Sequence, residues 1–157
     1  MSVVDSSHPR STKAVREVVM NIVVWVVQVL LAIAFLAHGW MLLSPPAGIV
    51  DQLNAALPRW FQVFIGAAEV LATVGLTLPA LTRILPGLVV WAAVGIMTVT
   101  ASATVFHLAR GEMSSAATTL ILFGLATFLA YMRYRVLPIP ARAAHDALHP
   151  FRRPTVG

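Results

Sequence analysis

The chain of 157 residues contains no cysteine and few charged side chains, and each shortage excludes a class of function. Without cysteine, the chain alone cannot run a thiol relay or a disulfide exchange, and cysteine usage gives no indication of its redox compartment. Charged residues make up 11% of the sequence and hydrophobic residues 59%, whereas soluble domains carry about 25% charged residues. The composition therefore indicates a membrane protein, and the length suits one compact bundle without a second domain.

The usual signatures of nucleotide-binding and hydrolytic enzymes are also missing. None of the patterns GxGxxG, GxxxxGK[ST], HExxH and GxSxG occurs in the sequence. The net charge of +5 comes from basic residues near the two ends of the chain, which is typical of membrane orientation rather than of a nucleic-acid site. We expect no soluble-type nucleotide chemistry and no nucleic-acid partner.

What the sequence does contain is four long apolar segments. They cover about residues 18–43, 60–78 and 84–108, and a last stretch that Ser114 or Ser115 can cap and that runs to about Tyr134. Segments of about 20 residues match the hydrocarbon thickness of a bilayer, and they are too long and too uniformly apolar for strands of a membrane barrel. The predicted fold is an all-α membrane protein, a bundle of four antiparallel transmembrane helices.

The segments define the expected domain organisation. A polar N-terminal tail covers residues 1–17, a four-helix membrane domain covers 18–135, and a partly disordered C-terminal tail covers 136–157. The first apolar run is too long for the core of a cleaved signal peptide. Residues 49–57, in the connection after it, suggest a short amphipathic piece on the bilayer surface.

The distribution of basic residues predicts which side of the membrane holds the tails. An even number of spans places both termini on one side. With both tails in the cytoplasm, nine basic residues lie inside and two, Arg59 and Arg110, lie outside. This asymmetry follows the positive-inside rule, so we expect a multi-pass protein of the plasma or inner membrane with both termini cytoplasmic.

Glu69 stands at the middle of the second segment, where a charged carboxylate costs roughly 2.5–3.5 kcal/mol by insertion scales. It must be protonated, paired or wetted, and it should face other helices. The helical period places it on one face with Gln62 and Thr73, opposite apolar residues that suit lipid. Glu69 is either a ligand-binding or proton-handling carboxylate, or a structural clamp between helices.

Two histidines are expected in the same half of the bundle as Glu69. His38 lies about five residues, or roughly 8 Å, below the outer boundary, and His107 closes the third segment near the outer surface. With Gln62 they form a candidate ligand-binding set around a funnel whose floor is Glu69. Arg59 and Trp60 are entrance candidates at the headgroup level.

Several chemistries suit such a site. Histidine and a buried carboxylate can relay a proton, and they can hold the carbonyl oxygens of a quinone by hydrogen bonds. His38 and His107 on facing helices could also ligate haem iron. Zinc is disfavoured because its ligands would lie at very different depths, and we expect no metal site. The plainer alternatives are a histidine bonded to a neighbouring helix carbonyl for His38 and interfacial exposure for His107.

The motifs resemble those of the DoxX-like membrane proteins. The resemblance rests on FLAHGWMLL at 35–43, FIGAAEVLATVGLTLP at 64–79 and TVFHLARGE at 104–112, and it covers about residues 22–135. It implies a four-helix membrane bundle. The family is named for a link to thiosulfate:quinone oxidoreductase, and some of its members accompany redox enzymes. The resemblance therefore implies a quinone-related or redox-accessory role, without any thiol chemistry because cysteine is missing.

The leading hypothesis is a redox-associated membrane subunit that binds a lipophilic molecule, a quinone, through Glu69 and His38, without catalytic activity of its own. A non-catalytic scaffold or interaction subunit is the alternative, and a haem-binding bundle is the third interpretation. The expected partners are the lipid bilayer and either a redox enzyme or another membrane subunit. A homo-oligomer is left open.

Overall fold

The protein is described here by a computed structural model that gives the backbone of residues 8–142 and the side chains of residues 12–142. Helices account for almost all of this part of the chain. Their bounds are α1 His8–Leu43, the 3₁₀ turn η1 Ala47–Ile49, α2 Val50–Ala56, α3 Arg59–Thr82, α4 Leu88–Ala109, α5 Met113–Tyr131 and the π-helical turn η2 Met132–Val136. The predicted disorder of the C-terminal tail falls largely on residues 143–157, which lie outside the described residues.

Four of the helices are long and apolar enough to cross a membrane, and they confirm the predicted four-span all-α fold. The spans are Thr12–Leu43, Arg59–Thr82, Leu88–Ala109 and Met113–Val136. No strand occurs in the described part of the chain. The chain is thus an integral membrane protein whose spans are joined by short connections, of which α2 forms the longest.

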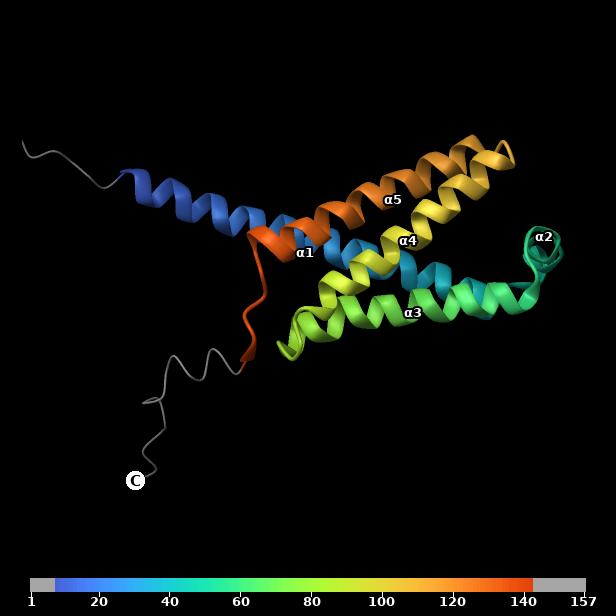
Figure 1. The fold of residues 1–157 in the computed structure, drawn as a ribbon, viewed down its shortest axis with the longest axis horizontal. Coiled ribbons are helices and arrows are strands. Elements are labelled where there is room, and N and C mark those ends of the chain that lie inside the picture. The colour runs from blue at the N-terminus through green and yellow to red at the C-terminus, as the bar shows by residue number, and fades with distance from the viewer. Residues whose placement is uncertain (1–7, 143–157) are drawn as a thin grey trace, which may run out of the picture.

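The four spans pack as two pairs (Figure 1). Helix α1 packs along α3, and α4 packs along α5, while α3 also meets α4 and α1 meets α5. One end of the bundle, which we call the tail end, holds the starts of α1 and α4 and the ends of α3 and α5. The other end, the loop end, holds α2 and the turn between α4 and α5. Toward the loop end the α4–α5 pair diverges from the α1–α3 pair (Figure 1).

Polar residues of α3 turn inward and its large apolar residues turn outward, as predicted. Gln62, Glu69 and Thr73 are all buried. On the opposite face, Phe64 is 64% exposed and Leu71 69% exposed. Such a surface would be unfavourable in water, but it suits acyl chains, because a lipid solvent removes the cost of exposed apolar area.

The ends of the helices differ from the predicted bounds. Helix α1 begins at His8, ten residues before the predicted start of the span, because nothing in this stretch breaks a helix and proline is tolerated in the first turn. Helix α4 begins at Leu88 and not near Ile84, since Pro86 disfavours helical backbone at the residue before it, and Leu85 has a φ of 49°. No serine caps α5, whose N-cap residue is Glu112.

Candidate functional site

A close crossing of α1 and α3 positions the acidic residue of the second span. At this crossing Gly39 faces Gly66: a Cβ on either residue would lie within 2.9 Å of the carbonyl oxygen of the other. Only glycine permits helix backbones to approach so closely. The preceding residue His38 and the nearby Glu69 are thereby brought within reach of each other across the two helices.

His38 and Glu69 form a hydrogen bond at this crossing. Nδ1 of His38 lies 2.7 Å from Oε2 of Glu69. The carboxylate is 3% exposed, whereas the histidine side chain is 52% exposed. Thr73 supports the same turn of α3, because its hydroxyl donates to the carbonyl oxygens of Glu69 and Ala32. The carboxylate is therefore fixed inside the bundle, and the imidazole extends from it toward the surface.

A cavity of about 380 Å³ lies beside this pair, between the two helix pairs. All four spans contribute to its wall: Ala34, Phe35 and His38 from α1, Glu69 from α3, Val99, Thr100, Ala103 and His107 from α4, and Ser115, Thr118, Thr119 and Leu122 from α5. Its volume falls within the range of about 300–1,000 Å³ typical of small-molecule sites. The cavity brings together three of the predicted site residues, His38, Glu69 and His107, from three different helices.

His107 is held by an acidic partner of its own. Nδ1 of His107 lies 2.6 Å from Oε2 of Glu112, and Nε of Arg110 donates to Oε1 of the same carboxylate at 2.7 Å. The hydrogen bond from Arg110, followed by that from His107, lowers the pKa of Glu112. Glu112 therefore stays ionised at neutral pH. Arg110 and Glu112 stand in the quoted motif TVFHLARGE, but the sequence does not reveal the bond between this carboxylate and His107.

The remaining site candidates lie elsewhere. Gln62 is buried near the start of α3, where its amide donates to Asn54 and to the carbonyl of Leu57. Arg59 donates to the carbonyls of Leu42 and Leu43, at the end of α1. Neither residue is among those that line the cavity. Their contacts hold α2 and the α1–α3 corner together.

Trp60 completes the set of entrance candidates. Its side chain is 71% exposed and lies in the first turn of α3, beside Phe61. A tryptophan at the end of a span, with an apolar body and one polar N–H, suits the headgroup level of a bilayer. It is not among the residues that line the cavity.

Threonine hydroxyls add polarity to the α4–α5 wall. They bond mainly to the preceding turn of their own helix; Thr100, for example, donates to the carbonyl of Ile96 at 2.8 Å. Thr104 and Thr119 also bond to each other across α4 and α5 at 2.8 Å. Sequence reasoning did not place these threonines in the site, because a hydroxyl that bonds to its own helix is tolerated on any face of that helix.

The two histidines offer the same chemical group to the cavity. In each, Nδ1 is bonded to a carboxylate, while within the described residues no hydrogen bond uses Nε2. A ring whose Nδ1–H is donated to a carboxylate has an acceptor at Nε2 when neutral and a donor there when protonated. The cavity thus combines an apolar body with two adaptable polar positions. No cluster of three or more metal-ligating side chains occurs in the described part of the chain.

Comparison with known proteins adds one finding. A model of the DoxX-like family matches residues 26–129, which include His38, Glu69, His107 and every other residue that lines the cavity. No curated protein and no solved structure matches the chain.

Proposed function

The chain belongs to the DoxX-like family, and from that premise we propose that its cavity between the two helix pairs binds a lipophilic molecule of the quinone class. The observation that carries the proposal is the His38–Glu69 pair on the wall of that cavity. The protein serves as a redox-associated accessory subunit of a membrane complex. The proposal is one of binding, and the electrons of any quinone reaction pass through a partner enzyme.

The composition of the cavity matches the chemistry of a quinone. A quinone ring is flat and apolar, with a carbonyl oxygen at each of two opposite edges. Phe35, Val99 and Leu122 supply apolar surface, and His38 and His107 supply a polar group on α1 and on α4. When the imidazole is protonated, Nε2–H donates to a carbonyl oxygen; when it is neutral, Nε2 accepts from a quinol hydroxyl. Either oxidation state can therefore be held.

The buried carboxylate of Glu69 positions His38 for binding either form of the ligand. Glu69 accepts a hydrogen bond from Nδ1 of His38, so it orients the ring and leaves Nε2 for the ligand. The position of His38 is also favourable for access, because half of its side chain is exposed at the edge of the bundle. A ligand dissolved in the bilayer can reach the polar pair without passing through water.

The orientation of the site follows from the basic residues. Four spans leave the two ends of the chain on the same side, and the nine-to-two distribution of basic residues favours the cytoplasm of a plasma or inner membrane for that side. The cavity then lies in the outer half of the bilayer. A partner enzyme would exchange quinone with the chain from that leaflet.

A structural clamp is the second candidate function for the same pair. The bond between His38 and Glu69 joins α1 to α3 directly beside the Gly39–Gly66 crossing. In this alternative the chain is a scaffold for another membrane protein, and the pair contributes only to the stability of the helix crossing. Binding and stability measured on the same variants distinguish the two.

The test is the affinity of the purified protein for decylubiquinone, measured in detergent or nanodiscs. We expect Glu69→Gln and His38→Ala each to weaken binding about tenfold or more, because a charge-assisted hydrogen bond contributes about 1.5–3 kcal/mol. Asp51→Asn is the matched control: it makes the same acid-to-amide change on the exposed helix α2 and should leave the affinity unchanged.

Three outcomes would count against quinone binding. Equal affinities of Glu69→Gln and the control, together with a lower unfolding temperature of Glu69→Gln, would assign the pair to a clamp. No saturable binding by the wild-type protein would remove the site altogether. A Soret band in the protein as purified, lost in both His38→Ala and His107→Ala, would indicate haem ligation by the two histidines instead.

A further inference from the structure

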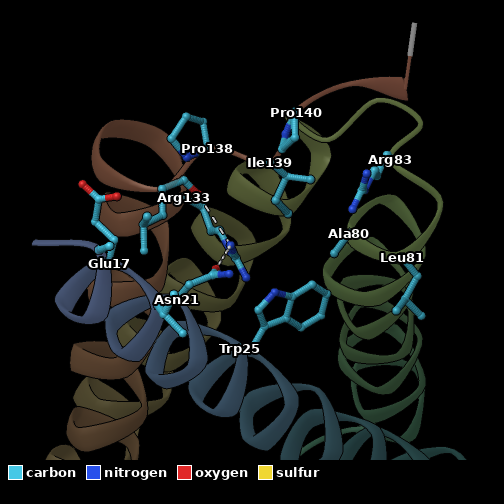
Figure 2. Close-up of a pocket in the computed structure, with 13 residues that line it drawn as sticks. Glu17, Asn21, Trp25, Ala80, Leu81, Arg83, Arg133, Pro138, Ile139 and Pro140 are labelled. Atoms are coloured by element: carbon cyan, nitrogen blue, oxygen red, sulfur yellow. Dashed lines mark hydrogen bonds between the residues drawn. The ribbon is translucent and has the colours of Figure 1, made fainter. Parts of the chain in front are cut away.

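A second cavity, of about 640 Å³, lies at the tail end of the bundle and shares no lining residue with the first. Its wall is formed by Ala14, Glu17, Val18, Asn21 and Trp25 of α1, Ala80 and Leu81 of α3, Arg83 after it, and Arg133 with residues 137–140 of the chain beyond α5. Most of these residues lie outside the family match. Figure 2 shows Arg133 and Arg83 on opposite sides of this cavity, with Trp25 between them.

Arg133 is a buried cation with incomplete partners. Its side chain is 5% exposed, and within the described residues no carboxylate pairs with it. Its bonds go to neutral oxygens: Nε donates to Gln28 at 3.0 Å, while Nη1 makes long contacts of 3.4 and 3.5 Å to Asn21 and to the carbonyl of Leu137. The buried Nη2 atom has no hydrogen-bond partner among the residues that the structure describes.

The burial of Arg133 without an ion-pair partner among the described residues is unfavourable unless a bound anion compensates its charge. A buried guanidinium without an anion leaves both its charge and its donors uncompensated. The indole of Trp25 lies 5.0 Å from the guanidinium carbon, but the face of an aromatic ring compensates a cation only in part. Gln28 cannot replace an anion either, since its own amide is committed to the carbonyl of Leu76 at 2.6 Å.

The other charged residues of the cavity also favour an anion. Arg83 adds a second positive charge on the opposite wall, directly after the end of α3. Glu17 is the one acidic residue on the wall, and Figure 2 shows its carboxylate turned away from the guanidinium of Arg133. No ion pair joins Glu17 to either arginine among the described residues.

We propose that this tail-end cavity binds a phosphate group between Arg133 and Arg83. Arginine matches phosphate because its planar fork presents two parallel N–H donors. Nη2 is closed off from solvent, so the guanidinium must shift toward the cavity before a phosphate oxygen reaches that atom. The contacts that hold Nη1 against such a shift are long, at 3.4 and 3.5 Å.

The location in the fold indicates two sources for the phosphate. The cavity lies where the spans end, since α3 stops at Thr82, α4 starts at Leu88 and the last span stops at Val136. Lipid phosphates occupy this depth of a bilayer, and the apolar residues Val18, Leu81 and Ile139 on the wall suit the upper part of an acyl chain. Free phosphate offers the same oxygens without the chains.

The experiment separates the sources by two arms on the full-length protein. In the first, native mass spectrometry counts phospholipids that remain bound after detergent exchange and after addition of phosphatidylglycerol. In the second, the unfolding temperature of delipidated protein is measured with inorganic phosphate against chloride of equal ionic strength. Retained lipid identifies a headgroup ligand, and a phosphate-specific rise in unfolding temperature identifies a free anion.

Arg133→Met should abolish either signal or weaken binding about tenfold or more, because it removes the charge-assisted donors of Arg133 and puts an unbranched apolar side chain in their place. Arg135→Gln is the matched control: it removes a positive charge two residues away, on an exposed side chain stacked on Tyr134. Arg83→Gln, which changes an exposed residue, gives a second variant if Arg133→Met does not fold.

The proposal is overturned if the wild-type protein retains no phospholipid and gains no stability from phosphate. Equal signals in Arg133→Met and Arg135→Gln would overturn it as well. If Arg133→Met does not fold, equal signals in Arg83→Gln and Arg135→Gln would overturn it. Decylubiquinone affinity is measured in parallel. Because the two cavities share no residue, failure of one proposal leaves the other standing.

Discussion

At the scale of single residues, the buried polar side chains Glu69, Gln62 and Arg133 determine how the spans meet. The helical period correctly placed Glu69 inside the bundle with Thr73, because one unfavourable charge in an apolar span constrains the rotation of the whole helix. Gln62 shares that face, yet its amide bonds to Asn54 in a connection whose path no periodicity specifies. Arg133 is one of the nine basic residues expected on the cytoplasmic side, and nothing in the local sequence reveals that its guanidinium is buried.

Glu112 carries a prediction about pH. Arg110 and His107 lower the pKa of Glu112. The ionised form of Glu112 therefore contributes to the stability of the fold at pH values above the ordinary carboxyl pKa. This contribution is lost as the pH falls through the lowered pKa of Glu112. We expect a carboxyl NMR titration to place Glu112 below a typical glutamate, and Arg110→Ala to move it back upward. Titration at the ordinary value in both proteins would show that the loop bonds of Glu112 do not persist in solution.

At the scale of helices, the close crossing of α1 and α3 is the feature on which the candidate site depends. Both glycines stand in the quoted motifs, but a sequence alone does not show that Gly39 and Gly66 face each other, because register between helices is set by packing along their whole length. Helix ends were predicted less well than helix centres. The start of α4 depended on the left-handed backbone at Leu85, a property of the turn rather than of the span.

Gly66→Ala tests the crossing. The added methyl would lie 2.8 Å from the carbonyl oxygen of Gly39, so the helices must separate, and we expect a loss of about 1–3 kcal/mol of stability. Reversible unfolding in mixed micelles measures this loss. Gly124→Ala on the exposed side of α5 is the control: nothing lies within 4 Å of its new methyl, and the better helix propensity of alanine should leave stability equal or up to about 1 kcal/mol higher. Similar stabilities for the two variants would contradict the close approach.

At the scale of the whole molecule, composition and charge predicted the architecture. Runs of apolar residues set the number of spans, and the prediction of four was confirmed because the lipid thickness dictates segment length regardless of details. The arrangement of the spans as two pairs with a cavity between them could not be read from the runs. That arrangement depends on which helix faces meet, as the Gly39–Gly66 contact and the Thr104–Thr119 bond show.

The orientation in the membrane is testable because the natural chain lacks cysteine. Single variants Thr12→Cys, near the start of α1, and Asp51→Cys, in α2, each provide one thiol. We expect an impermeant maleimide to label Asp51→Cys in intact cells and Thr12→Cys only after the membrane is opened, since basic residues gather with the termini. The reverse pattern would place the cavity beside His38 and Glu69 in the inner leaflet.

Photolabelling of the protein in its native membrane with a photoreactive benzoquinone, followed by mapping of the modified peptides, tests whether the cavity binds a quinone. We expect labels on cavity residues of α1, α4 and α5, around Phe35, Val99 and Leu122, with displacement by decylubiquinone and loss in Glu69→Gln. Labels confined to lipid-facing residues such as Phe64 and Leu71, unchanged in Glu69→Gln, would contradict it.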